Sequence, residues 1–319
     1  MEGTMIEGKG KKKRAGIIGA VILILVVVCL IIMAINSRKP EPIQLGQVEK
    51  DVKGAAFVTV NEILIEQMVD NWLPNDLFWP TVFLDNMPNF QIGELEVVRY
   101  NIRVLRDNLS RMRTTDKLDR WAEGAFTALS NDPYKWWFPS AESRWKKALK
   151  DLRAYYEGLK SGTSSFYPRS DNLVELLNQY ASLMGGVNTR LINAIQRKGK
   201  VLPVSEEDGK TTVGSDLVQL DIPWRQIDDN FYYAQGVAYA LHASFKAIRV
   251  DFYEVLERKR SLRLIDKIIE LLDRCHFEPW IVFNGSSGSI FANHSMNVSG
   301  PFNDARQKIY SLSVALQQG

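Results

Sequence analysis

Residues 15–35 read AGIIGAVILILVVVCLIIMAI, and these 21 residues contain no charged side chain. As an α-helix with a rise of about 1.5 Å per residue, the segment would be about 32 Å long, close to the roughly 30 Å hydrocarbon thickness of a bilayer. A cleaved signal peptide has a shorter apolar region, about 7–15 residues, and ends in small residues. Met33-Ala34-Ile35 matches such a cleavage site poorly. We therefore predict an uncleaved transmembrane helix over residues 15–35.

The charges on either side of this segment predict its orientation. Arg38 and Lys39 follow it, whereas five basic residues precede it: Lys9, Lys11, Lys12, Lys13 and Arg14. The flank richer in Lys and Arg stays in the cytoplasm, so residues 1–14 are expected to form a basic cytoplasmic tail. Everything after the span is then exported. The tail needs no partner beyond the anionic headgroups of the bilayer that residues 15–35 cross.

The exported part is electrically balanced. The net charge of the chain is +3, residues 1–14 supply all of it, and 35 basic and 35 acidic residues remain. A nucleic-acid-binding protein would carry a clustered basic face, so no nucleic-acid partner is expected. Cys29 lies within the span and leaves Cys275 as the sole exported thiol. A domain without disulfides is more typical of the bacterial periplasm than of a eukaryotic secreted protein. The expected location is the bacterial inner membrane.

Beyond the span, apolar residues recur with a helical period. Residues 36–56 are rich in Pro and Gly and predict a juxtamembrane linker. Residues 57–319 predict one all-α periplasmic domain, because steps of three and four place an apolar stripe on one helix face. The fold class is a single transmembrane helix followed by a multi-helix bundle. The predicted stripes cover residues 95–112, 145–159, 173–194 and 224–255.

Two stretches predict connections. Residues 199–221 contain Glu206-Glu207-Asp208-Gly209 and predict an acidic loop, and residues 284–301 are polar and serine-rich and predict a long surface connection. Gly185-Gly186 interrupts the third stripe, which predicts a kink or a close helix crossing.

A line of polar side chains at heptad spacing borders the fourth stripe. These candidates are Asp228, Gln235, His242 and Arg249. Residues seven apart lie about 10.5 Å apart along a helix, so any chemistry would need groups from another helix. The favoured interpretation of His242 is a hydrogen-bonded side chain at the margin of the bundle. Cys275-His276 and His294 lack the further donors at defined spacing that a metal needs, so no cofactor or metal is expected.

Aromatic residues crowd the run YKWWFPSAESRW over residues 134–145 and the Trp72–Phe83 region. Tryptophans such as Trp136, Trp137 and Trp79 could grip sugar rings, sit at a membrane interface or fill a loop–helix corner. Core packing is the favoured interpretation, with a binding surface as the alternative. A glycosidase would also need two carboxylates across a cleft. The candidates for that role are Glu62, Glu66, Asp70, Glu94 and Glu175.

One resemblance extends over essentially the whole chain. The run WLPNDLFWPTVFLDNMPNFQIGELEVVRYNIRVLRDNLSRMR over residues 72–113, together with Ala292-Asn293-His294-Ser295, resembles the bacterial envelope family catalogued as domain of unknown function 2333. The resemblance implies an inner-membrane protein with one N-terminal span. It implies neither catalytic residues nor a substrate.

These observations favour an interaction or scaffold module of the cell envelope with a protein partner. The alternatives are a cell-wall or lipid-acting hydrolase that uses paired carboxylates, and a lipid-binding bundle with an apolar cavity of several hundred Å³. A homo-oligomer is left open, because Gly16 and Ala20 form one small-xxx-small pair.

Overall fold

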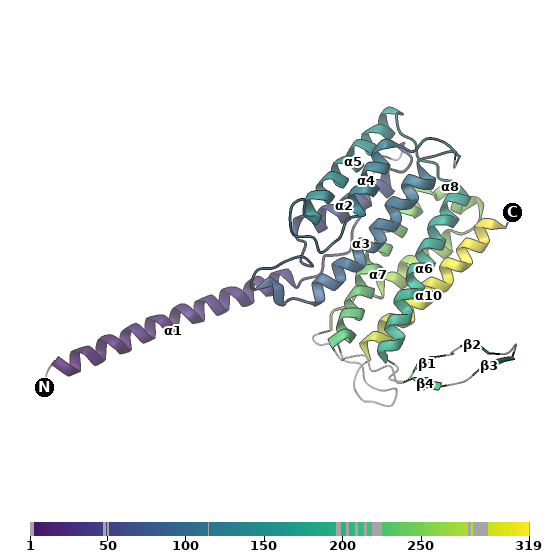
Figure 1. Cartoon of the computed structure of the whole chain (residues 1–319). Helices are drawn as coiled ribbons and strands as arrows, with labels where there is room; N and C mark the ends of the chain where they lie inside the picture. Colours follow the sequence, from purple (N-terminus) through teal and green to yellow (C-terminus); the bar gives the residue numbers. More distant parts are fainter. Residues whose placement is uncertain are drawn as a thin grey trace.

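The computed structural model describes residues 3–46, 49, 51–113, 115–195, 199–201, 204–207, 210–213, 216–218, 225–279, 282 and 293–318. The first helix, α1 (Gly3–Asn36), projects from the rest of the molecule as a long rod (Figure 1). Its segment Gly16–Asn36 has a mean hydropathy of 3.5. Among the described residues it is the one helix long and apolar enough to cross a membrane, and it lies one residue from the predicted segment.

The predicted all-α fold is confirmed, although the described part of the chain also contains four short strands within residues 199–218. A single 3₁₀ turn, η1, precedes α3, and a π-helical turn, η2, extends it. The helices after α1 are α2 (Ala55–Asp70), η1 (Thr81–Phe83), α3 (Asn86–Val104), η2 (Leu105–Leu109), α4 (Arg120–Leu129), α5 (Ala141–Ser161), α6 (Ser170–Ile195), α7 (Arg225–Asp251), α8 (Tyr253–Arg258), α9 (Leu262–Asp273) and α10 (His294–Gln317).

The helices form three layers, of which the middle one is a pair of helices. α3 packs along α7 in the middle, α2, α4 and α5 cover one side, and α6, α9 and α10 cover the other (Figure 1). The predicted stripes face this core, except that Met112 at the end of the first stripe lies beyond η2 and is exposed. Phe231, Phe245 and Ile248 of α7 are fully buried, as are Leu173 and Leu177 of α6. Burial of such stripes is the main stabilising contribution in a bundle of this kind.

The central pair is unusually close because two glycines face each other's backbones. A Cβ atom at Gly236 of α7 would lie 1.9 Å from the carbonyl oxygen of Phe90, and one at Gly93 of α3 would lie 2.2 Å from that of Tyr233. No other residue type fits at either position without moving the helices apart.

Two predicted connections differ from the structure. Within 199–221 lie two antiparallel pairs, β1 (Gly199–Val201) with β4 (Asp216–Val218) and β2 (Val204–Glu207) with β3 (Lys210–Val213). Valine and threonine, which favour extended backbone, occupy several of these positions. Residues 294–301 belong to α10, because the Asn293 side chain accepts a hydrogen bond from the Met296 amide (3.0 Å) and starts the helix. Residues 284–292 lie outside the described part.

Candidate functional site

Two loops at one end of the bundle expose large apolar side chains. The loop between α2 and α3 and the loop between α4 and α5 are joined by Trp72 Nε1, which donates to the Pro133 carbonyl (2.9 Å), and by Asn75 Nδ2, which donates to the Lys135 carbonyl (3.3 Å). We call their exposed apolar side chains the aromatic rim: Leu77, Phe78, Trp79, Val82, Phe83, Tyr134, Trp136, Trp137 and Phe138.

The tryptophans of this region divide into two groups. Trp72 and Trp145 are buried, pack edge to face with ring centroids 4.4 Å apart and fill the corner between the loops and α5. Trp79, Trp136 and Trp137 instead expose 60%, 56% and 68% of their surface. The rings of Trp136 and Trp137 pack edge to face, with their centroids 5.6 Å apart. The prediction of core packing is therefore wrong for Trp79, Trp136 and Trp137, because Trp72 and Trp145 fill the corner in their place.

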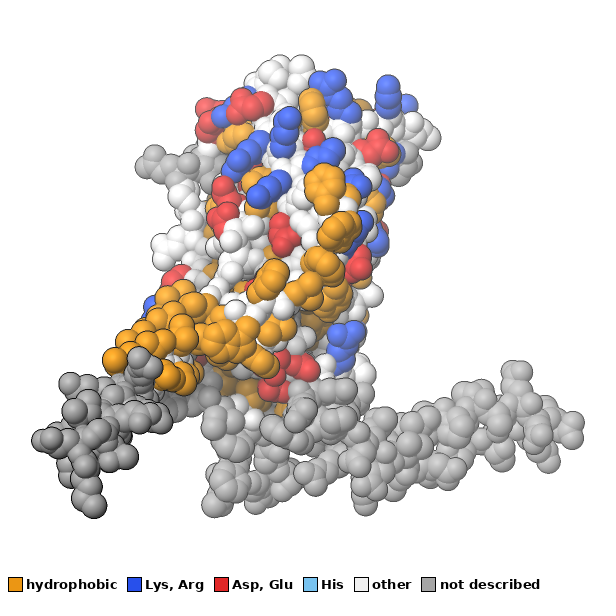
Figure 2. Space-filling view, turned by 60° about the vertical axis from the view of Figure 1, so that its left-hand side comes forward, with side chains coloured by type: hydrophobic (Ala, Val, Ile, Leu, Met, Phe, Trp, Pro, Cys, Tyr) orange, Lys and Arg blue, Asp and Glu red, His pale blue; other side chains and the backbone are white. Residues whose placement is uncertain are grey.

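The aromatic rim lies beside the end of α1. η1, which carries Val82 and Phe83, approaches α1. One face of α1 is partly covered near its C-terminal end. On this face Cys29 is buried, and Ile32, Met33 and Asn36 are half-buried. Figure 2 shows hydrophobic side chains gathered where α1 meets the bundle, whereas the opposite end of the same face carries mainly Lys, Arg, Asp and Glu.

A second feature of this end is a set of contacts around the half-buried Lys39. Lys39 Nζ donates to Gln235 Oε1 and to the carbonyl oxygen of Phe277 (3.0 Å), and it lies 4.8 Å from the centre of the Tyr232 ring. Gln235 Nε2 donates to the carbonyls of Cys275 (3.0 Å) and Phe277 (2.8 Å). Burial lowers the pKa of Lys39 to about 8, which leaves the ammonium charged at neutral pH.

The segment after Lys39 lies along α7. Tyr239 Oη donates to the Glu41 carbonyl (3.2 Å), and Lys246 Nζ donates to the carbonyl of the buried Ile43 (3.3 Å). At the far end, Asp251 Oδ2 accepts from the Phe57 amide (2.7 Å) and caps α2. Burial raises the pKa of Asp251 to about 6. Residues that the sequence assigns to the linker thus make specific contacts with the bundle. We call the contacts of Lys39, Glu41 and Ile43 the junction.

The predicted polar line on α7 does not form one site, since each member has a different partner. Gln235 belongs to the junction. His242 is buried, with Nε2 3.8 Å from Asp273 Oδ1 of α9. Arg249 forms an ion pair with Asp266, also of α9. Asp228 lies near Asp229 and Asp85, and burial raises the pKa of Asp228 and, to about 6, that of Asp229.

His242 makes the stability of the bundle depend on pH. Burial and the nearby Lys246 and His276 lower its pKa to about 4, although Asp273 acts in the opposite direction. The unfolded chain binds a proton near pH 6.5 and the folded chain does not, so stability falls as pH drops from 6.5 toward 4. Lowering the pH from 7.5 to 5.5 should decrease the free energy of unfolding of both proteins. We expect this decrease to be about 1.4 kcal/mol smaller in His242→Gln than in the wild type. Urea unfolding of the detergent-solubilised chain at both pH values measures this difference, and equal losses would contradict it.

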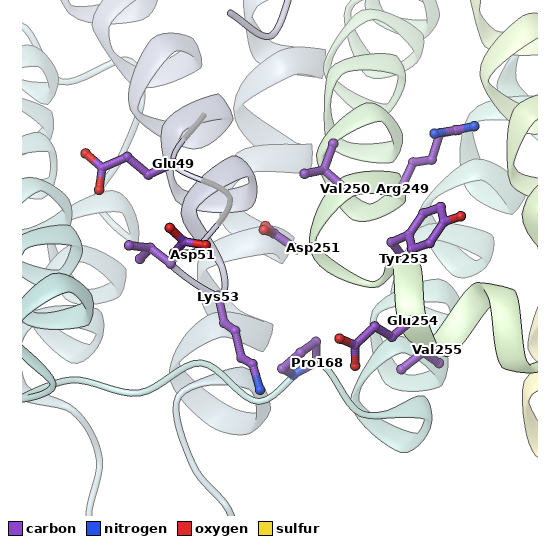
Figure 3. Close-up of a pocket in the computed structure, with 11 residues that line it drawn as sticks. Glu49, Asp51, Lys53, Pro168, Arg249, Val250, Asp251, Tyr253, Glu254 and Val255 are labelled. Carbon is purple, nitrogen blue, oxygen red and sulfur yellow. The ribbon is translucent and has the colours of Figure 1, made fainter. Parts of the chain in front are cut away.

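At the end of the bundle remote from the junction, an open pocket of about 560 Å³ lies between the start of α2 and the turn from α7 to α8 (Figure 3). We call it the distal pocket. Its walls carry charges of both signs beside the exposed Val250 and Tyr253. The charged lining residues are Glu49, Asp51, Lys53, Arg249, Asp251 and Glu254. Such a mixed lining, with charged and apolar side chains side by side, is typical of surfaces that contact other proteins.

Of the five carboxylates predicted as candidates for a catalytic pair, Glu62 and Glu66 share a partner, and the other three have separate surroundings. Glu62 and Glu66, one turn apart on α2, share Arg153, whose Nη2 lies 2.9 Å from Glu66 Oε1 and whose Nε lies 3.9 Å from Glu62 Oε2. Burial raises the pKa of Glu62 to about 7. Glu94 is buried within α3, where burial raises its pKa to about 8. Asp70 is exposed, and Glu175 accepts a hydrogen bond from Gln179 (2.8 Å).

The remaining chemically interesting residues lie in packed surroundings. The His294 ring lies 6.4 Å from that of Phe231 and 6.3 Å from that of Phe277. Burial raises the pKa of the Cys275 thiol to about 12, and burial lowers the pKa of His276. Within the described residues no group of three or more metal-ligating side chains occurs.

The structure contains a buried polar cluster that was not predicted from the sequence. Asn101 Nδ2 of α3 donates to Asn61 Oδ1 and Ser244 Oγ (both 2.9 Å), and Asn101 Oδ1 accepts from Tyr180 Oη (2.5 Å). This cluster connects α2, α3, α6 and α7. The signal for it is the position of Asn61 and Asn101 among apolar residues on the buried faces of their helices, where a polar group must find partners.

A protein-family model described as "Uncharacterized protein conserved in bacteria (DUF2333)" matches residues 9–319. No curated protein and no solved structure matches the chain significantly.

Proposed function

The chain belongs to the DUF2333 family of uncharacterised bacterial proteins, and on this premise we propose that it is an inner-membrane-anchored interaction module of the cell envelope. In this proposal α1 crosses the inner membrane with its basic end in the cytoplasm, and the bundle faces the periplasm. The basic residues before the span and the charge balance of the rest of the chain support this orientation.

The junction is the observation that carries the proposal. Lys39 is three residues beyond the end of the apolar segment at Asn36, and its ammonium is already held inside the bundle. A bundle attached in this way keeps a fixed height and orientation relative to the span. The distal pocket then lies at the end of α7 away from the membrane, about 24 Å from Gln235 by helical rise. That arrangement presents a surface with charges of both signs to a partner in the periplasm.

The test uses a photo-crosslinking amino acid in intact cells. We expect benzoylphenylalanine in place of Tyr253, in the distal pocket, to give a discrete covalent adduct with an envelope protein. The matched control replaces Tyr310, which is similarly exposed but lies on α10 outside the pocket. No adduct at Tyr253, or the same adduct at both positions, would overturn the proposal.

The junction can be tested separately. In Lys39→Ala the two described hydrogen bonds from Lys39 Nζ are lost and the Gln235 oxygen is left without its ammonium donor. Because each such bond contributes about 1 kcal/mol or more, we expect cleavage by proteinase K between the span and α2 to become about tenfold faster or more. Arg38→Ala is the control, since that side chain is exposed. Similar cleavage rates in the two variants would show that the junction does not hold the segment.

A further inference from the structure

We propose that the aromatic rim inserts into the membrane leaflet beside α1, so that the bundle rests on the lipid through two loops in addition to its span. The inference requires, from the proposed function, only that α1 crosses the bilayer. The occupant of this apolar surface is thus the lipid of the leaflet on the side of the membrane that carries the bundle.

The depth of the rim follows from α1 itself. Cys29 is only 8% exposed, and it lies seven residues before the end of the apolar segment at Asn36. Seven residues correspond to about 10 Å of helix. η1 approaches this end of α1, and the half-buried side chains Ile32 and Met33 belong to the same face. Part of the loop that carries Phe78 and Phe83 is therefore beside the span at a depth that corresponds to lipid.

The composition of the rim is that of a membrane interface. Outside α1, fifteen large apolar side chains are exposed among the described residues, and nine of them belong to the rim. Residues 77–83 and 136–139 contain no charged side chain. Phe78 and Phe138 expose 83% and 80% of their surface, which would be unfavourable in water for side chains of this size. Tryptophan and tyrosine have an apolar ring with a polar N–H or O–H and concentrate at the headgroup level.

Charged groups border the rim where headgroups would lie. Lys135 directly precedes Trp136, and Arg38 follows the end of the span by two residues. Both side chains are exposed. Their long stems allow the apolar part to remain at the interface while the charge reaches the lipid phosphates. The position of the rim beside a spanning helix favours lipid as its occupant over a protein partner.

The experiment measures tryptophan quenching by lipid in the full-length chain. The protein is reconstituted into vesicles of phosphatidylethanolamine and phosphatidylglycerol with or without bromine near the headgroup end of the acyl chains. Trp79, Trp136 and Trp137 are three of eight tryptophans. Because these three side chains contact lipid in this proposal whereas Trp72 and Trp145 are buried, we expect the triple Trp→Phe variant to lose more than about half of the bromine-dependent quenching.

Two matched variants make the result specific. Trp121→Phe removes a tryptophan from the start of α4, at the end opposite the rim loop, and is expected to leave the quenching unchanged. Phe78→Glu with Phe138→Glu keeps all eight tryptophans but places charges in the rim, and should reduce the quenching because a carboxylate is unfavourable in lipid. Edge-to-face packing of Trp72 and Trp145 gives a near-ultraviolet circular dichroism signal that checks folding.

Unchanged quenching in the triple variant, with the chain inserted in the vesicles, would overturn the lipid contact. The result is independent of the envelope partner, since the vesicles contain none. Loss of the Tyr253 adduct in cells would overturn the proposed interaction module and leave the quenching as it is.

Discussion

Replacing Gly236 by alanine is expected to destabilise the bundle by about 3 kcal/mol or more, because overpacking at a rigid contact costs about 1–3 kcal/mol and here the obstacle is backbone. The new methyl group would lie 1.9 Å from the Phe90 carbonyl oxygen and 3.0 Å from the Phe90 Cα. Side chains can rotate away from such a contact, but a carbonyl within a helix cannot. α3 and α7 would have to separate, and the core on both sides would lose packing. Urea unfolding of the detergent-solubilised chain measures the change.

Gly186→Ala is the matched control for this substitution. Gly186 lies within α6, and a Cβ atom there would have no neighbour within 4 Å. The same change should therefore stabilise the chain by up to about 1 kcal/mol, the difference in helix propensity between alanine and glycine. Equal effects of the two substitutions would mean that the contact between α3 and α7 is not close in solution.

Replacing Asn101 by alanine is expected to cost about 4 kcal/mol, since each buried polar group left without a partner costs about 1–3 kcal/mol. Asn101 has three hydrogen-bond partners, Asn61, Tyr180 and Ser244, and all of them are buried. Ser244 Oγ retains its bond to the Ala240 carbonyl (2.8 Å), whereas the Tyr180 hydroxyl loses the one described bond that it donates. Removal of the amide also leaves a cavity between four helices.

Tyr180→Phe separates the hydrogen bonds from the cavity. It removes one hydroxyl and keeps the ring, which packs 5.5 Å from that of Phe245. We expect a loss of about 1–2 kcal/mol, well below that of Asn101→Ala. The double variant should cost less than the sum of the two, because both substitutions remove the same bond. Additive losses would show that the two residues do not interact.

The helical part of the fold was predictable because each helix carries its own signal. The stripe over 173–194 coincides with α6 (Ser170–Ile195), and the stripe over 145–159 lies within α5 (Ala141–Ser161). The stripe over 224–255 covers α7 and continues past its end at Asp251 into α8, since the turn at Phe252 leaves the apolar spacing intact.

Features that depend on contacts distant in the sequence were not predictable. A kink or a close helix crossing was expected at Gly185-Gly186. There α6 continues as one helix, and the three atoms nearest to a Cβ at Gly185 belong to the Arg306 side chain. The close backbone contact lies instead at Gly93 and Gly236. The positions of these two glycines relative to the apolar stripes do not predict it. The junction joins Lys39 to Gln235, 196 residues away. The exposure of Trp136 and Trp137 depends on what surrounds their loop, which local composition does not specify.

The half-buried ammonium of Lys39 affects how favourably the bundle can associate with a partner. A domain on a flexible linker samples many orientations, and only some of them allow binding. When a complex forms, the domain loses this rotational freedom at a cost in entropy. A bundle held by its junction has already lost this rotational freedom, so less entropy is given up when a complex forms. If the partner is anchored in the same membrane, both molecules diffuse in two dimensions with their surfaces at a set height, which raises their effective concentration. Lys39 would then contribute to association without touching the partner.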